Sequence, residues 1–328
     1  MMIRKLIGKV LRRPGKRVMH AKHYGIRRED IHHGALKVCD RLQDAGYEAY
    51  VVGGAVRDLM LGKSPKDFDV ATSATPEQVR HIFNRSRIIG RRFRIVHVPF
   101  YERGGEEIIE VTTFRGAGEA PTDESGRILR DNVYGSLEDD ALRRDFTVNA
   151  LYYDPSREEI IDFHHGVDDL ESKKKLVMIG EADVRYREDP VRMLRAVRLA
   201  AKLGLEIAPT TRKPISEHAN LLQNIPSARL FDEMMKLLLS GRAWDCLMSL
   251  RAEGLHNYLF PVLDQLLTKP ATAQFLQKAL ASTDQRLAED KPVSAGFLFA
   301  ALLWHEVEAD WQKRQAAGEY PVPPWWRR

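Results

Sequence analysis

The chain has 328 residues, with 51 Lys and Arg against 46 Asp and Glu, and 44% of its residues are hydrophobic. This length predicts two or three domains with a sizeable core, and the composition excludes wholesale disorder. Two cysteines, Cys39 and Cys246, are too few for a disulfide framework or a cysteine zinc site, and the most apolar stretch, 295–304, is about half as long as a membrane helix. We therefore expect a reduced, cytoplasmic protein without a membrane span.

The positive charge is concentrated at the start of the chain. Residues 1–28 contain ten Lys or Arg and no acid, so the other 300 residues sum to a charge of −5. A basic arm of this kind commonly binds nucleic acid through the phosphates, without reading the base sequence. A transit segment or a solvated tail would have the same composition.

From residue 34 the pattern alternates between helix and strand. A helix with apolar spacing up to Gly46 precedes a strand at 48–52, a Gly53-Gly54 pair, a short helix ending near Leu61 and a strand at 67–71. Thr75-Pro76 predicts a helix start, and 94–100 with 107–114 predict a hairpin. A polar loop at 116–135 and a capping box at 136–139 follow.

Asp67 and Asp69 are the first candidates for chemistry. Side chains alternate in a strand, so these two carboxylates project together while Phe68 and Val70 enter the core. Two adjacent carboxylates favour a cation between them, and oxygen ligands of this kind suit Mg²⁺. Two solvent-exposed aspartates on a half-buried strand would give the same pattern.

Two neighbouring features strengthen the metal interpretation. Gly53-Gly54 lies between a strand and a helix, where backbone N–H groups can approach phosphate oxygens. Glu110 interrupts an apolar strand, where an unpaired acid is costly to desolvate, although an edge-strand glutamate facing water is the alternative. Metal carboxylates beside a phosphate cradle are the minimum for phosphoryl or nucleotidyl transfer.

Beyond about residue 165 the strand signals fade and helices follow at 184–202, 227–239, 243–253, 273–282 and 294–304. The predicted fold class is α+β, a mixed sheet with flanking helices followed by an all-helical remainder. We predict a basic arm at 1–33, followed by a head that carries the candidate residues and by the helical remainder.

Five motifs occur together in order along residues 35–240. They are VVGGAVRD at 51–58, KDFD at 66–69, EVTTFR at 110–115, RRDFTVNA at 143–150 and REDPVRMLRAVR at 187–198. The combination resembles the class II tRNA nucleotidyltransferase/poly(A) polymerase family. The resemblance implies a polymerase-β-like nucleotidyltransferase head at 34–163, followed by a helical neck at 164–225 and a helical body at 226–328.

The resemblance also implies roles for individual residues. Asp67 and Asp69 would be the Mg²⁺ ligands, with Glu110 as the third carboxylate of the head. The triphosphate would be held by Gly53, Gly54 and Arg57, and Arg144 and Asp145 would lie against the sugar and phosphates. Asp189 and Arg192, with Arg195 on the same predicted helix face, would read the incoming base by hydrogen bonds. Without the other motifs, we would interpret this basic helix as having a solvent-exposed face with internal ion pairs.

The segment IIGRRFRIVHV at 88–98 resembles the bacterial poly(A) polymerase branch more than the CCA-adding branch. The expected reaction is in-line attack of an RNA 3′-hydroxyl on the α-phosphate of ATP, which expels pyrophosphate and needs Mg²⁺. The expected partners are RNA 3′ ends, ATP and bacterial RNA-degradation proteins. Bacterial poly(A) polymerases generally continue past this length, so we expect the helical body to be incomplete.

Three alternatives remain open from the sequence. A CCA-adding enzyme would share the head and its chemistry but accept both CTP and ATP. A non-catalytic RNA-binding protein on the same scaffold is disfavoured by the intact carboxylates. A metal-dependent phosphohydrolase would need a His/Asp cluster, for which no spacing is convincing.

Overall fold

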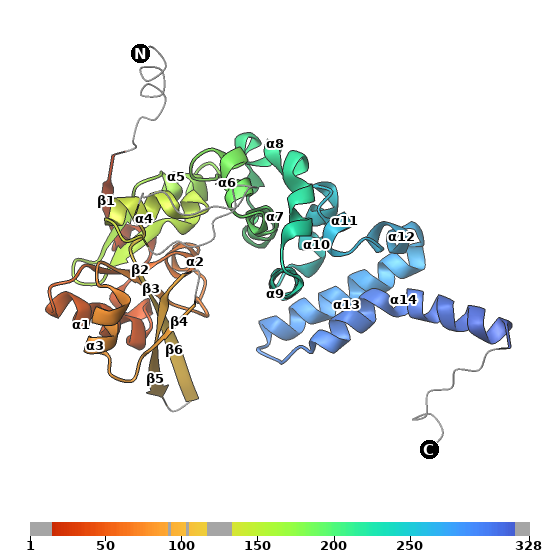
Figure 1. The fold of residues 1–328 in the computed structure, drawn as a ribbon, viewed down its shortest axis with the longest axis horizontal. Coiled ribbons are helices and arrows are strands. Elements are labelled where there is room, and N and C mark those ends of the chain that lie inside the picture. Colours follow the sequence, from red (N-terminus) through yellow and green to blue (C-terminus); the bar gives the residue numbers. More distant parts are fainter. Residues whose placement is uncertain (1–14, 91–92, 103–104, 117–132, 319–328) are drawn as a thin grey trace, which may run out of the picture. The chain divides into compact units, whose positions relative to one another are not determined.

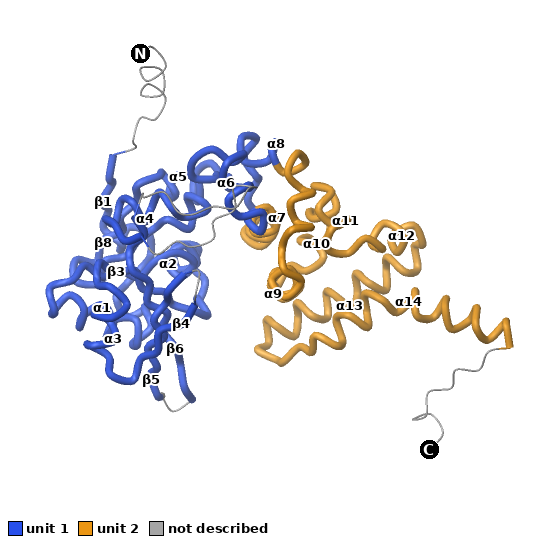
Figure 2. Tube along the Cα trace, in the orientation of Figure 1, with its two compact units in different colours: residues 1–192, 205–214 blue, residues 193–204, 215–328 orange. Residues whose placement is uncertain are grey.

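The computed structural model describes residues 15–90, 93–102, 105–116 and 133–318. The chain divides into two compact units, one of residues 1–192 with 205–214 and one of 193–204 with 215–328 (Figure 2). The predicted neck segment, 164–225, contributes to both units. Each unit is described separately below.

The first unit is built on one eight-stranded sheet (Figure 1). In spatial order its strands are β1 (Arg17–His20), β8 (Glu159–Asp162), β7 (Leu151–Asp154), β2 (Ala49–Val52), β3 (Asp69–Thr72), β6 (Gly105–Thr113), β5 (Ile95–Glu102) and β4 (Arg87–Ile89). Strands β3 and β6 are parallel, and the other neighbouring pairs are antiparallel. The β5–β6 pairing confirms the predicted hairpin, whose tip at 103–104 lies outside the described residues.

Helices cover both faces of this sheet. α1 (His33–Asp44) and α3 (Pro76–Ile82) pack on one face, and α4 (Leu137–Arg143) contributes to the apolar cluster on the other. The Thr75 and Ser136 hydroxyls accept hydrogen bonds from the third helical N–H of α3 and α4, so both predicted helix starts are confirmed. The unit also contains α2 (Gly54–Met60), α5 (Gly166–Glu171), α6 (Ala182–Glu188) and the short 3₁₀ helices η3 (Ala21–Tyr24), η4 (Arg28–Asp30) and η5 (Thr147–Asn149).

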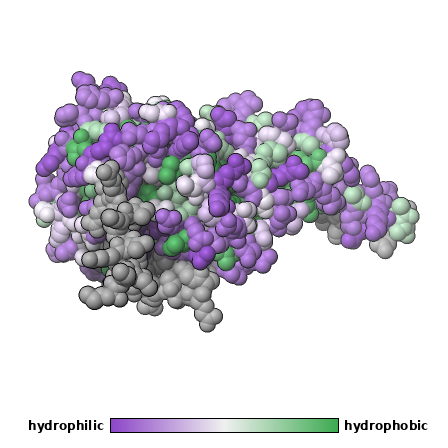
Figure 3. Space-filling view, turned by 90° about the horizontal axis from the view of Figure 1, so that it is seen from above, coloured by the Kyte–Doolittle hydropathy of each residue, from purple (hydrophilic) through white to green (hydrophobic). Residues whose placement is uncertain are grey.

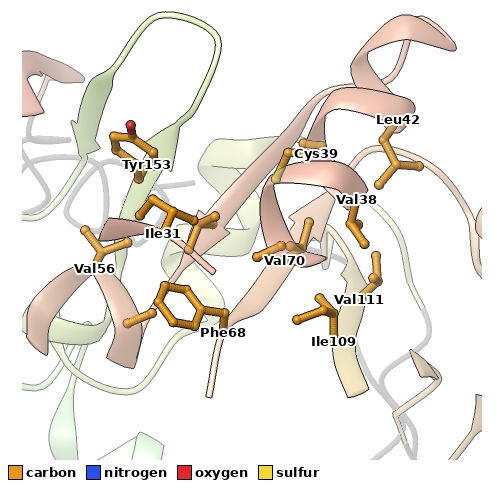
Figure 4. Close-up of a cluster of buried hydrophobic side chains, with 14 of the residues drawn as sticks. Ile31, Val38, Cys39, Leu42, Val56, Phe68, Val70, Ile109, Val111 and Tyr153 are labelled. Carbon is orange, nitrogen blue, oxygen red and sulfur yellow. The ribbon is translucent and has the colours of Figure 1, made fainter. Parts of the chain in front are cut away.

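The larger core lies between α1, α3 and the sheet. Figure 4 shows Val70 of β3 and Ile109 and Val111 of β6 beneath Val38 of α1, with Phe68 beside them. Because side chains alternate along a strand, the burial of these apolar residues turns their polar neighbours to the opposite side. The packing of the core therefore determines where the acidic residues of these strands project.

The predicted single helix over 184–202 is wrong, because two helices meet there. α6 ends at Glu188 and α7 (Val191–Leu203) begins after Pro190, while Asp189 between them has extended backbone angles, φ −152° and ψ 94°. The cause is Pro190, which disfavours helical angles in the residue before it. Asp189 therefore leaves the helical face that Arg192 and Arg195 share.

A short parallel pair joins two segments of the first unit that are distant in sequence. β9 (Lys175–Leu176) pairs with β10 (Glu206–Ile207), and the Tyr186 hydroxyl donates to the carbonyl of Thr211 at 2.8 Å. The Thr211 hydroxyl in turn accepts from the N–H of Met178 at 2.9 Å. These contacts place residues 205–214 in the first unit.

The second unit is helical over its described residues (Figure 1). It contains most of α7 and the end of α8 (Pro209–His218), followed by η6 (Ala219–Asn224), α9 (Ser227–Leu238), α10 (Ala243–Ala252), α11 (His256–Leu259), α12 (Leu263–Thr268), α13 (Pro270–Ala288) and α14 (Ala295–Ala316). The expected fold class, a mixed sheet with flanking helices followed by a helical remainder, is confirmed.

Hydrophilic residues predominate on the face of the molecule shown in Figure 3, where hydrophobic residues form only small patches. Among the described helices, none combines the length and the apolar composition that crossing a membrane requires.

Candidate active site

The three acidic residues predicted to carry chemistry meet at one place in the sheet. Asp69, the first residue of β3, is directly opposite Glu110 on the parallel strand β6. Asp67 precedes the strand, which begins two residues later than predicted, yet Asp67 and Asp69 are exposed while Phe68 between them is buried. The predicted alternation therefore holds even where the backbone is not yet a strand.

The position of Asp69 is unfavourable for a negative charge. Partial desolvation, and then the nearby charge of Glu110, raise the pKa of Asp69 to about 6, with Asp67 acting in the same direction. Arg144 opposes this effect through its positive charge. Four groups singled out in the sequence thus act on one another electrostatically at this site.

The donor set at this site fits a divalent metal ion. Asp67, Asp69 and Glu110 offer only carboxylate oxygens, the ligand type that Mg²⁺ prefers. Burial and the charges of Glu110 and Asp67 raise the pKa of Asp69, and a bound divalent cation would act in the opposite direction. Glu110 also faces His97, its opposite residue on β5, with His97 Nε2 3.3 Å from Glu110 Oε1.

Gly53 directly follows β2, the strand that neighbours β3 and its carboxylate residue Asp69. The backbone angles of Gly53, φ 76° and ψ −127°, are accessible to glycine alone, and a side chain there would stand 3.6 Å from Arg144 Nη1. The Gly53 N–H already donates to the Leu151 carbonyl at 3.1 Å. Glycine is therefore required here by its backbone angles and not by crowding, and its own amide is occupied.

A buried hub that the sequence analysis missed holds Arg144. The Asp140 carboxylate accepts from Arg144 Nε at 3.1 Å and from the Tyr152 hydroxyl at 2.7 Å, and Arg144 Nε also lies 2.9 Å from that hydroxyl. Desolvation opposes ionisation of Asp140, yet Arg144 and Tyr152 hold its pKa below the ordinary value. The four-residue spacing of Asp140 and Arg144, following a capping box, was the signal available in the sequence.

Arg57 and Asp145 lie in a second network. Arg57 is only 5% exposed; it contacts Asp58 at 2.7–2.8 Å and donates from Nη1 to the Asn149 side chain at 2.5 Å. Asn149 donates in turn to Asp145 at 3.1 Å, and Asp145 also accepts from the Phe146 N–H. A Cβ at Gly54 would lie 3.4 Å from Arg57 Nη2, an ordinary van der Waals contact. This network positions the loop after α4, and the predicted triphosphate contacts of Gly53, Gly54 and Arg57 stay a prediction.

The predicted base-reading residues lie along α6 and α7. Arg192 donates to Glu188 at 2.8 Å and to the carbonyl of Arg185 at 2.9 Å. Asp189 lies at the break between the helices, and Arg195 lies on α7 in the second unit. Glu188 and Arg185 are further residues of this segment that the sequence analysis did not single out.

Two family models match the chain. Residues 49–176 match "Poly A polymerase head domain", and residues 204–267 match "Probable RNA and SrmB-binding site of polymerase A". The first range contains the three carboxylates and the Arg144 hub, so the geometry described above falls within the head match.

Individual relatives agree with these matches. The chain is 47% identical over 304 residues to poly(A) polymerase I of Salmonella typhi, covering 89% of this chain and 64% of that protein. It is 39% identical over 236 residues to a CCA-adding enzyme of Latilactobacillus sakei, covering 71% of this chain and 57% of that enzyme. The chain thus spans slightly less than two thirds of the curated poly(A) polymerase.

A solved structure extends the likeness to three dimensions. The CCA-adding enzyme of Bacillus stearothermophilus, determined in complex with CTP, superposes with a TM-score of 0.65 at 33% identity, covering 84% of this chain and 69% of that one. Sequence and fold therefore agree. The chain belongs to the class II tRNA nucleotidyltransferase/poly(A) polymerase family.

Proposed function

We propose that the protein is a template-independent polynucleotide adenylyltransferase, which adds AMP from ATP to RNA 3′ ends. The observation that carries this proposal is the direct pairing of Asp69 with Glu110 on adjacent parallel strands, with Asp67 two residues away. Clustered acids of this kind carry an electrostatic cost that a metal-bound triphosphate would relieve.

Each group has a task in this reaction. Asp67 and Asp69 would hold Mg²⁺, with Glu110 as the third carboxylate; when bound, the ion lowers the pKa of the attacking hydroxyl and stabilises the leaving oxygens. Arg144, held by Asp140 and Tyr152, places a fixed positive charge beside the carboxylates, where the triphosphate oxygens would lie. Asp145, held by Asn149, would orient the sugar.

The base would be read by protein side chains. Asp189 can accept a hydrogen bond from an exocyclic amine, and Arg192 can donate to a ring nitrogen. Arg195, three residues after Arg192 on α7, would also contact the nucleotide.

ATP is proposed as the substrate because of the branch of the family that this chain resembles more. Identity reaches 47% with a poly(A) polymerase, against 39% with a CCA-adding enzyme and 33% with the CTP-bound structure. The segment 88–98 favours the same branch. CCA addition is the alternative, since solved CCA-adding enzymes share the fold.

The RNA partner is proposed on similar grounds. A segment matching an RNA-binding model lies at 204–267, and the basic arm at 1–28 suits generic RNA phosphates. A cytoplasmic location and an association with RNA-degradation proteins are further parts of the proposal.

The proposal is tested by incubating the purified protein with Mg²⁺, α-labelled ATP and a short RNA. We expect label to enter RNA with a free 3′-hydroxyl, with release of pyrophosphate, and not to enter RNA that ends in a 3′-deoxynucleotide. The Asp69→Asn variant should show no incorporation. Incorporation by this variant at the rate of the unmodified protein would contradict the assignment.

A further inference from the structure

Arg185 connects the two predicted halves of the nucleotide site. Its side chain is 8% exposed, and Nη2 donates to the backbone carbonyls of Arg143 and Arg144 at 2.7 and 2.6 Å. These carbonyls end α4, where helix carbonyls lack partners within the helix. The guanidinium therefore holds the backbone on which the Arg144 side chain begins.

The second terminal nitrogen of the Arg185 guanidinium binds the predicted base-reading segment. Arg185 Nη1 donates to Glu188 Oε2 at 2.6 Å, and the same oxygen accepts from Arg192 Nη1 at 2.8 Å. Arg192 also donates to the carbonyl of Arg185 itself. Glu188 thus joins two arginines, one facing the end of α4 and one on the base-reading helix.

The surroundings of Arg185 are unfavourable for its positive charge. Burial, and then the charge of Arg192, lower the pKa of Arg185 to about 10. Within the described part of the chain, Arg185 Nε is buried without a hydrogen-bond partner. A residue that merely closed a helix end would not need a buried charge shared with Glu188 and Arg192.

The backbone around this residue is also restrained. The carbonyl of Asp145 accepts from the N–H of Ile179 at 2.9 Å, and the N–H of Thr147 donates to the carbonyl of Val177 at 3.0 Å. Residues 177–185 therefore bind the loop after α4 along its length, and Arg185 forms the last link before the break at Asp189.

We propose that Arg185 is a positioning residue that fixes the base-reading segment 188–192 against Arg144, and that it thereby sets selectivity among nucleoside triphosphates. The inference rests on the proposed function, since it assumes that Arg144 contacts the phosphates and residues 189 and 192 the base. A planar guanidinium with several fixed donors can hold two carbonyls and Glu188 at once, whereas a lysine ammonium is a single point charge.

The test compares Arg185→Lys with Arg187→Lys. Arg187 lies on the same helix and pairs with Asp183 at 3.0 Å, but its side chain is 52% exposed, so it is a matched control. We expect Arg185→Lys to keep the melting temperature within a few degrees and to lower the ratio of kcat/KM for ATP over CTP by about tenfold. Arg187→Lys should leave the ratio unchanged.

Glu188→Gln provides a second variant. It should lower the ATP-over-CTP ratio as Arg185→Lys does, and the double variant should lose no more than either single variant, because both changes break one link. An unchanged ratio in Arg185→Lys would overturn the inference. So would an equal loss of rate for every nucleotide, since that is the result of a purely structural role.

Nucleotide binding separates this inference from the proposed function. The dissociation constants for ATP and CTP, measured calorimetrically without RNA, should show selectivity in the unmodified protein that Arg185→Lys reduces. Selective binding without RNA extension would contradict the proposed function and leave this inference standing. If the unmodified protein binds ATP and CTP equally, the inference is wrong.

Discussion

At the scale of single residues, Asp69 occupies a position that is unfavourable for its negative charge. Its partners on β3 and β6 are fixed by the core beneath them, so it cannot move away from Glu110. Burial, and then the charge of Glu110, raise the pKa of Asp69 to about 6, above the ordinary value of 3.8. The folded protein therefore binds this proton more tightly than the unfolded chain does.

This difference predicts that Asp69→Asn raises the melting temperature by an amount that depends on pH. The stabilisation by the bound proton is fully present below pH 3.8 and is lost as the pH rises through about 6. An asparagine avoids that loss. In buffer with a chelator, we expect the variant to melt higher than the unmodified protein at pH 7.5, with a smaller gap at pH 5. Adding Mg²⁺ should raise the melting temperature of the unmodified protein alone. A gap that does not change with pH would contradict the account.

The Asp140 hub predicts a second effect on stability. Asp140→Ala leaves the half-buried Arg144 and the buried Tyr152 hydroxyl without their carboxylate, so we expect a loss of about 3 kcal/mol in the free energy of unfolding. Tyr152→Phe removes one hydrogen bond and should cost about 1 kcal/mol. Denaturant titration checks both values, and equal losses would show that Asp140 is not the centre of the network.

The sequence was sufficient to predict that Asp67 and Asp69 project together and that Glu110 joins them, because strand alternation and burial determine where they project. Their roles as metal ligands stay a prediction. The sequence was not sufficient for Asp140, Tyr152 or Arg185. Their roles depend on hydrogen bonds to groups on other elements, such as the carbonyls at the end of α4. No local pattern encodes such contacts.

At the scale of elements, predictions from short sequence signals were correct where hydrogen bonds to the local backbone determine where a helix begins. Thr75 and Ser136 begin helices as their capping residues predict. The predicted helix over 184–202 failed because its apolar spacing continues across Pro190, which breaks it. The break takes Asp189 out of the helical face that Arg192 and Arg195 share.

Gly166 shows how tightly two elements can approach. A Cβ at this position would lie 2.2 Å from the carbonyl oxygen of Thr147, so Gly166→Ala must push α5 away from η5. We expect a loss of about 1–3 kcal/mol in stability. Activity should also fall, because η5 carries Asn149, the partner of Asp145. Gly15→Ala is the control, since nothing lies within 4 Å of its Cβ position. A neutral Gly166→Ala would show that this approach is not tight.

At the scale of the whole molecule, charge is distributed unevenly between the parts expected to bind RNA. The segment 204–267 matches an RNA-binding model, yet it carries six Lys or Arg against seven Asp or Glu. The arm at 1–28 carries ten basic residues and no acid. The general affinity for RNA phosphates should therefore depend strongly on the arm.

Removal of residues 1–14 tests this dependence, because it deletes five Lys or Arg and leaves β1 intact. We expect weaker RNA binding at low salt and a slope of log K against log salt that is shallower by up to about 3.5. Replacing the same five residues by glutamine in the full chain should give the same result. An unchanged slope in both proteins would show that the arm does not contact RNA.

The fold class could be predicted because the motifs and the change from strands to helices extend over long segments. Which residues belong to each unit could not be predicted. Residues 205–214 join the first unit through β9–β10 pairing and the hydrogen bonds of Thr211. Such contacts between distant segments leave no periodic signal in the sequence. The predicted boundaries of arm, head, neck and body stay a prediction.

The central claim is that this chain transfers adenylate to generic RNA 3′ ends. It is tested most directly by offering each of the four nucleoside triphosphates separately, with Mg²⁺, on a generic RNA and on a tRNA lacking its terminal CCA. The account predicts A-only tails on the generic RNA, abolished by Asp69→Asn. Addition of C and then A, confined to the tRNA, would contradict it and assign the chain to the CCA-adding branch.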